Sequence, residues 1–260
     1  MIRITWLGTA TIFIDVDGER LLFDPFFRLN KKLEITPLEK FCKVDAIFNT
    51  HAHLDHACDL PVILKNSSAK LYAPNQTIEN LSELGVDIPN KAIVVHPKQI
   101  VKTKNSEIVV HKSCHVKFDL PLIIKTALRV LFTFQFKKAI KLLKLNKKFP
   151  MKNEIYAYEI KANDYKIFLM GSAGYMKDYA YPKDVDLLVL PFQGRNNMTK
   201  YSIKIVEQIM PKSIILDHFD NAYPPITKRI KTDKFIKLVK EKFPKIVIIE
   251  PEYNKIIAIK

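Results

Sequence analysis

Residues 49–61 read NTHAHLDHACDLP and place four metal-competent side chains within six positions, namely His51, His53, Asp55 and His56. The whole chain contains only seven histidines, so this clustering is unusual. Imidazole and carboxylate groups are common ligands of zinc, iron and manganese. Their spacing allows one turn to aim two side chains at one metal and two at a neighbouring metal. We therefore interpret the segment as a candidate metal centre rather than a polar surface turn.

The sequence before this segment predicts strands. Residues 2–8, 11–18 and 20–27 alternate or run apolar and stop at Gly or Pro, and the Asp17-Gly18 pair predicts a hairpin turn. Residues 44–50 form a short apolar run, so the histidine segment should lie on the loop that leaves this strand. Residues 57–68 and 75–85 are predicted to contain helices, the second ending at Gly85.

The second half predicts strands at residues 154–161, 165–171, 185–191, 213–218, 245–251 and 255–260, with helices at 199–210 and 227–243. Strands alternating with helices indicate an α/β protein in which helices cover the outside of packed sheets, an αββα sandwich. We expect one domain over residues 1–260, with an insertion at 119–150 that reads as one long amphipathic helix. Within it, Lys137, Lys141, Lys144 and Lys148 recur at helical spacing.

The composition of the chain restricts which classes of protein and partner are possible. The chain has 260 residues, 48% of them hydrophobic, which is enough for a substantial core. A net charge of +15 favours anionic partners such as nucleic acid, phosphorylated small molecules or an acidic membrane surface, although a solvated cationic face explains it equally well. Three widely spaced cysteines and the lack of a long uncharged apolar run predict a soluble cytoplasmic protein without a disulfide framework.

The segment THAHLDH, residues 50–56, resembles the HxHxDH signature of the metallo-β-lactamase fold hydrolases. Asp24 in LLFDP is similar to the aspartate that ends an early strand in that family. His115 and His218 stand where its later ligand histidines are expected, and LPFQG at residues 190–194 resembles one of its strand ends. The layout is most similar to the branch containing ascorbate-6-phosphate lactonase and N-acyl-phosphatidylethanolamine phospholipase D.

This resemblance implies an αββα sandwich with the site at one edge. His51, His53 and His115 would hold one metal, and Asp55, His56 and His218 would hold a second. The expected cofactor is zinc, one or two ions, with Mn or Fe as alternatives. His111 is the alternative third ligand, although its position in a strand favours a structural role, and His96 before Pro97 is expected at the surface.

One residue departs from the family pattern. The family carries a bridging aspartate in a turn after a strand, and Ser172 stands at the corresponding position in FLMGSAGY. Serine is uncharged, so the second metal should bind less well. The alternatives are a single metal, two metals bridged by hydroxide alone, or an inactive descendant. Asp178 and Asp184 are nearby in sequence and are candidates to replace the missing carboxylate.

The leading functional hypothesis is a metal-dependent hydrolase that uses a metal-activated hydroxide on an ester, lactone or phosphodiester. Asp55 would orient the water and shuttle its proton, and Asp55, His218 or solvent would protonate the leaving group. The substrate would be a small molecule or an anionic, lipid-like compound, and residues 119–150 would shape this choice or contact an acidic membrane. A homo-oligomer through that segment is left open. The alternatives are a metallo-nuclease, for which nucleic acid would be the substrate, and a non-catalytic binding module.

Overall fold

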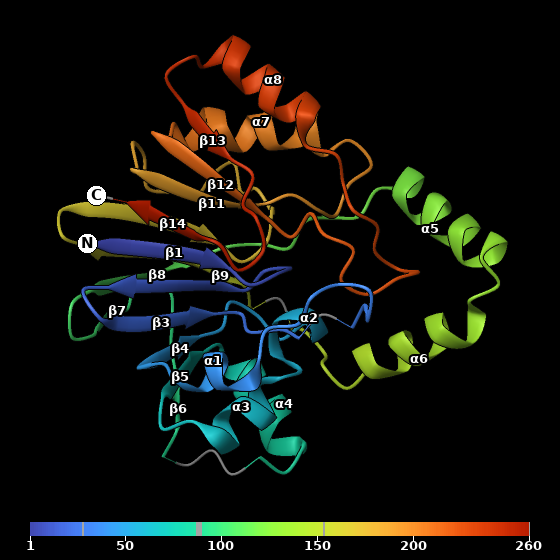
Figure 1. Ribbon diagram of the computed structural model, residues 1–260, viewed down its shortest axis with the longest axis horizontal. Coiled ribbons are helices and arrows are strands. Elements are labelled where there is room, and N and C mark those ends of the chain that lie inside the picture. The colour runs from blue at the N-terminus through green and yellow to red at the C-terminus, as the bar shows by residue number, and fades with distance from the viewer. Residues whose placement is uncertain (28, 87–89, 153, 260) are drawn as a thin grey trace.

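The computed structural model describes residues 1–27, 29–86, 90–152 and 154–259. These residues form two seven-stranded sheets packed face to face (Figure 1). The first sheet has the order β14-β1-β2-β3-β4-β5-β6. Its strands are β1 (Ile2–Trp6), β2 (Ile12–Val16), β3 (Glu19–Phe23), β4 (Ala46–Phe48), β5 (Lys70–Ala73), β6 (Ala92–Val94) and β14 (Ile256–Ile259).

The second sheet has the order β13-β12-β11-β10-β9-β8-β7. Its strands are β7 (Ile100–Lys102), β8 (Glu107–Lys112), β9 (Tyr156–Ala162), β10 (Tyr165–Met170), β11 (Leu187–Pro191), β12 (Ser213–Asp217) and β13 (Val247–Ile249). Both sheets mix parallel and antiparallel pairs; for example, β1 pairs antiparallel with β2, whereas β11 pairs parallel with β12. The inner faces of the two sheets share one apolar core, in which Phe48 and Tyr158 pack against each other.

Helices cover the outer faces of both sheets. On the side of the first sheet lie α1 (Leu38–Cys42), α3 (Leu60–Asn66) and α4 (Asn75–Glu83), and on the side of the second lie α7 (Met198–Ile209) and α8 (Asp233–Lys242) (Figure 1). The remaining described helices are α2 (Leu54–Ala57), α5 (Leu120–Phe132) and α6 (Phe136–Asn146). The predicted αββα sandwich is therefore confirmed.

The turn between β2 and β3 follows the predicted chemistry. Asp17 and Gly18 both adopt positive φ, +49° and +86°, as a two-residue hairpin turn requires. Gly85 likewise follows α4 with φ +75°, where a residue without a Cβ is favoured. Local turn signals thus fix two of the chain reversals of the first half.

Two helix predictions were wrong in part. Residues 119–150 form two helices rather than one, because Phe134 adopts φ +54° and the Thr133 hydroxyl donates to the Arg129 carbonyl oxygen, which together end α5. Neither Gly nor Pro marks this break. The helix predicted at 227–243 begins only at Asp233, since Thr227 instead holds a loop by accepting a hydrogen bond from the Tyr223 amide at 2.9 Å.

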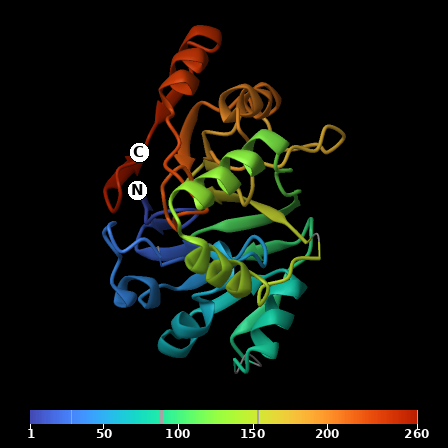
Figure 2. The same ribbon diagram turned by 90° about the vertical axis from the view of Figure 1, so that its right-hand side faces the viewer.

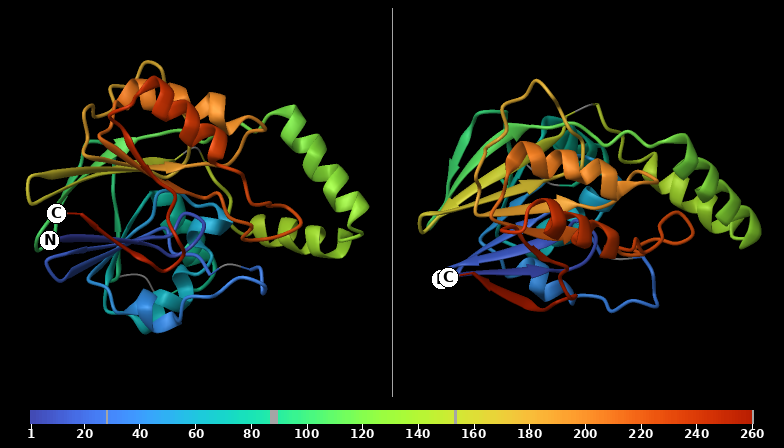
Figure 3. Two further views of the ribbon diagram at one scale, coloured as in Figure 1. Left: turned by 45° about the horizontal axis from the view of Figure 1, so that its top comes forward. Right: turned by 90° about the horizontal axis from the view of Figure 1, so that it is seen from above.

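Helices α5 and α6 form a hairpin that stands apart from the layers. Figure 2 shows both helices crossing in front of the ends of the sheets, and Figure 3 shows them projecting beyond the sandwich in two further views. The first and last strands of the described chain lie side by side at the opposite end. Among the described residues, no helix is long and apolar enough to cross a membrane.

Candidate metal centre

The candidate ligands lie on loops that leave strands at one end of the sandwich. His51 follows β4, His115 follows β8, and His218 comes directly after the last residue of β12. His53 precedes the short helix α2, which carries Asp55 and His56. Both sheets therefore contribute to a single site, which explains how residues more than 160 positions apart in sequence meet.

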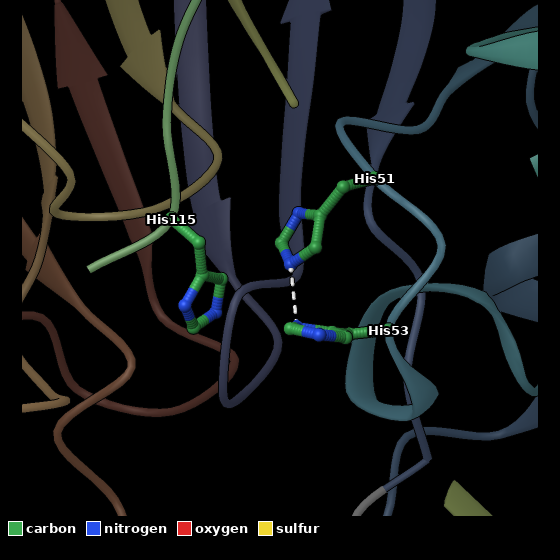
Figure 4. Close-up of side chains that lie close together, drawn as sticks. All are labelled: His51, His53 and His115. Carbon is green, nitrogen blue, oxygen red and sulfur yellow. Dashed lines mark hydrogen bonds between the residues drawn. The ribbon is translucent and has the colours of Figure 1, made fainter. Parts of the chain in front are cut away.

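His51, His53 and His115 form the first group of candidate ligands. One ligand atom from each lies within 4.8 Å of the others. His51 Nε2 and His53 Nδ1 are 3.2 Å apart, and His115 faces both rings from the opposite side (Figure 4). Burial lowers the pKa of all three, well below 6.5 for His51 and to about 4 for His53. They are therefore neutral imidazoles, which is the form that binds metal.

Two hydrogen bonds determine which ring nitrogens carry protons. The Thr50 hydroxyl donates to Asp24 Oδ2 at 2.5 Å, so its oxygen accepts the proton of His51 Nδ1 at 2.9 Å. His115 Nδ1 donates to the Val116 carbonyl oxygen at 2.8 Å. Each bond leaves Nε2 of the ring with a free lone pair, as in metal-ligating histidines whose other nitrogen is held by the protein.

Asp55, His56 and His218 form the second group, again with ligand atoms within 4.8 Å of one another. His218 Nε2 lies 3.1 Å from Asp55 Oδ2. Burial opposes both charges. It is outweighed at Asp55 by His56 first and by the hydrogen bond and charge of His218, which together hold the pKa of Asp55 well below 3.8. At His218 it is outweighed by the hydrogen bond and charge of Asp55, with Asp217 and Asp220 adding to them, and the pKa of His218 rises to about 9. Without a metal these two groups form an ion pair.

Asp24 holds the histidine loop in place. Its buried carboxylate accepts hydrogen bonds from the Asn49 side chain at 3.0 Å and from the Thr50 amide at 2.7 Å, besides the Thr50 hydroxyl. Asp24 Oδ2 also lies 2.8 Å from His56 Nδ1. Its own φ is +43°, a conformation unusual for a residue with a Cβ. The aspartate noted at the end of an early strand is therefore the anchor of both groups.

Thr9 joins the His218 loop to the N-terminal strands. The His218 amide donates to the Thr9 carbonyl oxygen at 2.7 Å, and the Thr9 amide donates to Asp220 Oδ2 at 3.2 Å. His218 itself adopts φ +59°. Asp220 thus stabilises the loop that presents His218 through a backbone contact.

Ser172 and Gly171 close the site from the side of β10. Ser172 is buried, lines the same cavity as both groups and accepts a hydrogen bond from the Val116 amide at 3.0 Å, which ties it to the His115 loop. A Cβ at Gly171 would lie only 2.2 Å from Thr50 Cβ. The chain can pass this close to the histidine loop only because residue 171 is glycine.

The cavity over the two groups has a volume of about 260 Å³. Five of the six candidate ligands line it, together with Ser172, Gln193 and Tyr223. Phe118, Leu142, Leu143 and Ile226 form an apolar part of its wall, to which α6 also contributes Asn146. Among the described lining residues there is neither Lys nor Arg. The cavity can therefore admit a ligand whose apolar part contacts these apolar side chains while another part faces the candidate metal groups.

The structure brings all six predicted ligands together and separates the other candidates from them. His111 contacts Glu159 instead, with 2.9 Å between Nε2 and Oε2, which fits the structural role expected for it. His96 is exposed. Asp178 and Asp184 are also exposed and lie outside the set of residues that line the cavity. Neither occupies the place of a bridging carboxylate.

Sequence reasoning missed Tyr223. Its hydroxyl donates to Asp55 Oδ2 at 3.0 Å and it lines the cavity. The only available signal was its position five residues after His218, in a segment that reads as an ordinary Pro-rich turn. Thr50 was missed as well, although it directly precedes His51.

Comparisons with known proteins agree with this architecture. A UPF0173 metal-dependent hydrolase of Pyrococcus furiosus is 27% identical over 256 residues, covering 96% of this chain and 97% of the relative. The structure of Igni18, a metallo hydrolase of Ignicoccus hospitalis, superposes with a TM-score of 0.67 at 19% identity, covering 100% of this chain and 99% of the other. The metallo-beta-lactamase fold protein YhfI of Bacillus subtilis gives a TM-score of 0.66 at 16% identity and 98% coverage of both. The model of the beta-lactamase superfamily domain matches residues 19–219, and the chain therefore belongs to this superfamily.

Proposed function

We propose that the protein is a metal-dependent hydrolase acting on an ester, lactone or phosphodiester. The observation that carries this proposal is the convergence of two three-residue groups, one of three histidines and one of two histidines and an aspartate, beside one cavity. The names of relatives that align over almost the whole chain support it, since they are called metal-dependent hydrolases. The closer placement within the lactonase and phospholipase branch stays a prediction.

The residues present fit a divalent metal. His51, His53 and His115 offer neutral nitrogens, and the second group adds a carboxylate that is ionised at neutral pH. This nitrogen and oxygen set suits zinc, with manganese or iron as alternatives. Three protein ligands leave an open position, as in catalytic rather than structural sites. We therefore expect one tightly held ion at the first group and a weaker second ion, because Ser172 supplies no charge.

When bound, the metal would lower the pKa of water toward neutrality and polarise the substrate oxygen. The chain supplies the remaining functions. Asp55 is positioned by the Tyr223 hydroxyl and by His218, and it can orient a water molecule and accept its proton. His218 or Asp55 can return a proton to the leaving group, because both lie at the cavity.

The cavity wall supports a small or lipid-like substrate. Phe118, Leu142 and Ile226 would contact an apolar substituent while the scissile bond faces the histidines. The positive net charge is the support for the alternative of a metallo-nuclease. That alternative is disfavoured because neither Lys nor Arg lines the cavity among the described residues. As part of the same proposal we place the protein in the cytoplasm, since its three cysteines are free.

The test is elemental analysis of protein purified without chelators, combined with hydrolysis assays on ester, lactone and phosphodiester substrates. Replacing His51 with Ala should remove bound metal and activity together, and replacing His218 with Ala should abolish activity while retaining part of the metal. His96→Ala is the matched control, because His96 is exposed and lies outside the site. If reconstituted protein holds no metal, or if His51→Ala hydrolyses every substrate as well as the parent chain, the proposal fails. A non-catalytic binding module is then the better interpretation.

A further inference from the structure

Helix α5 presents an apolar face to solvent. Among its described residues none is buried, although its sequence, LPLIIKTALRVLF, is largely apolar. Leu120, Ile124, Leu128 and Leu131 are exposed and recur every three or four residues, which places them on one face. Phe132 is 73% exposed at the end of this helix. A soluble helix normally turns such a face toward the core.

The polar side of the same helix faces the body of the protein. The Arg129 guanidinium donates to the carbonyl oxygens of Pro225 and Ile226, both at 3.1 Å. Lys125 Nζ donates to Asn196 Oδ1 at 2.6 Å. These bonds orient α5 with its apolar face outward. Leu122 and Val130 are half-buried like Arg129, so α5 carries apolar side chains on both sides, and its exposed apolar face is a property of the folded chain.

The hairpin continues this surface with positive charge. The turn residue Phe134 is 83% exposed, and Phe136, Ile140 and Leu143 of α6 are exposed as well. Lys137, Lys141 and Lys144 are also exposed on α6 and are spaced to lie beside this apolar row. Residues 120–150 contain seven Lys and one Arg and neither Asp nor Glu. Apolar and cationic groups thus share one surface.

This charge distribution distinguishes between the candidate occupants. A second copy of the chain bound symmetrically through the hairpin would bring the same lysine-bearing surface against itself, with no carboxylate from residues 120–150 to neutralise it. An anionic lipid surface offers acyl chains to the apolar row and negative headgroups to the lysines. We propose that the hairpin α5–α6 docks on the surface of a bilayer that contains anionic lipid.

The position of the hairpin links docking to the cavity. Leu142 and Leu143 of α6 line the cavity wall, and Leu143 is also 57% exposed. A docked hairpin therefore places the cavity mouth beside the lipid surface. Docking itself depends only on the hairpin, whereas delivery of an amphiphilic substrate to the cavity rests on the proposed function.

The first experiment is co-sedimentation of the full chain with phosphatidylcholine vesicles and with mixed phosphatidylcholine–phosphatidylglycerol vesicles. We expect binding to the mixed vesicles, weakened by salt, and at least tenfold weaker binding to the neutral ones. The triple variant Lys137→Gln, Lys141→Gln, Lys144→Gln should lose at least about tenfold in affinity, since each lysine near an anionic surface adds to the attraction. Equal binding to both vesicle types, or binding to neither, overturns the proposal.

A matched variant distinguishes the loss of the proposed docking surface from a general loss of positive charge. The triple variant with Gln at Lys234, Lys237 and Lys240 makes the same charge change at exposed positions of α8. It should keep vesicle affinity within about twofold, because α8 lies on the outer face of the second sheet and is not part of the hairpin (Figure 1). If both triple variants lose affinity equally, binding is a nonspecific effect of net charge and the docking surface is wrong.

A second pair of variants tests the apolar row. Ile124→Ser with Leu128→Ser removes two exposed residues of α5, which should weaken vesicle binding at least tenfold. Ile35→Ser with Leu84→Ser is the control, because these side chains have similar exposure, 50% and 41%, and lie outside the hairpin. Sedimentation velocity identifies the competing occupant: a dimer lost only in the α5 variant would overturn lipid docking in favour of a second copy.

The vesicle experiment tests docking independently of the proposed hydrolase activity. The His51→Ala variant should bind vesicles as well as the parent chain, because His51 is buried and lies outside the hairpin. Failure of the hydrolase proposal would leave this result unchanged, and failure of docking would leave metal content and hydrolysis of soluble substrates unchanged.

Discussion

Replacement of Gly171 by Ala should disturb both folding and metal binding, because Gly171 packs directly against the histidine loop. The added Cβ would lie 2.2 Å from Thr50 Cβ, 2.3 Å from Thr50 Oγ1 and 2.7 Å from Thr50 Cγ2. Rotation about χ1 of Thr50 cannot relieve a contact with its Cβ. The two backbones must therefore separate by more than about 1 Å to reach ordinary packing distances.

The cost follows from what Thr50 holds. Its amide and hydroxyl both donate to Asp24, and its hydroxyl oxygen accepts from His51. Overpacking alone costs about 1–3 kcal/mol, and weakening one hydrogen bond to a charged group adds roughly 1.5–3 kcal/mol. We expect the free energy of unfolding to fall by about 3–5 kcal/mol and metal affinity at the first group to fall with it, since the Thr50 bond fixes the His51 ring.

Urea unfolding of the metal-free protein measures the first effect, and metal competition with a chromophoric chelator measures the second. Gly18→Ala is the control, because Gly18 has φ +86° but no neighbour within 4 Å of an added Cβ. It should cost only about 1–2 kcal/mol, the price of a left-handed conformation. If Gly171→Ala is no more destabilising than Gly18→Ala and binds metal normally, the close packing inferred at Thr50 is wrong.

Three further predictions concern other side chains. Ser172→Asp should raise the number of metal ions bound per chain, because it returns a carboxylate to the cavity; stoichiometry equal to that of Ser172→Ala would show that this position does not face the metals. Tyr223→Phe should lower metal affinity about tenfold by removing the hydrogen bond to Asp55, and unchanged affinity in a competition assay would count against that role. Asp186→Asn should lower the free energy of unfolding at pH 7 by about 1–2 kcal/mol. Burial raises the pKa of Asp186, but the hydrogen bonds from Lys212 and from the Lys166 amide, together with the charges of both lysines, outweigh it and hold the pKa below 3.8. This contribution is present above that value and is lost as pH falls through the lowered pKa, so a difference between parent and variant that persists in acid-range urea titrations would contradict the assignment.

The grouping of four of the six candidate ligands could be expected from the sequence because its signal is local. His51, His53, Asp55 and His56 occupy one turn after a strand. Residues this close in sequence stay close in space however the rest of the chain packs. His115 and His218 could be placed only by resemblance, since nothing in their neighbourhoods distinguishes them from His111. The packing of β8 decides between them: it directs His111 to Glu159 and leaves His115 on the loop beside the other histidines.

The parts that escaped prediction depend on contacts between distant segments. Tyr223 reaches Asp55 across 168 positions of sequence, so no local pattern could reveal it. The break between α5 and α6 has no glycine or proline, and Phe134 adopts its positive φ without a residue that favours it. The outward orientation of the apolar face of α5 could not be predicted either, because it also depends on contacts between distant segments. Helical spacing shows that a face exists, but the bonds of Arg129 to residues 225 and 226 determine where it points.

The pairing of β1 with β14 has a consequence for how the chain is made. Ile2 pairs with Ile259, so this edge of β1 has no partner until β14 leaves the ribosome. Until then the edge exposes unpaired backbone groups, the feature that templates intermolecular strand addition. Closing it joins strands far apart in sequence, which predicts slow completion of the first sheet. The three histidines of the first group, by contrast, are all present once residue 115 has emerged, so a metal bound early would stabilise the nascent chain before β14 is made.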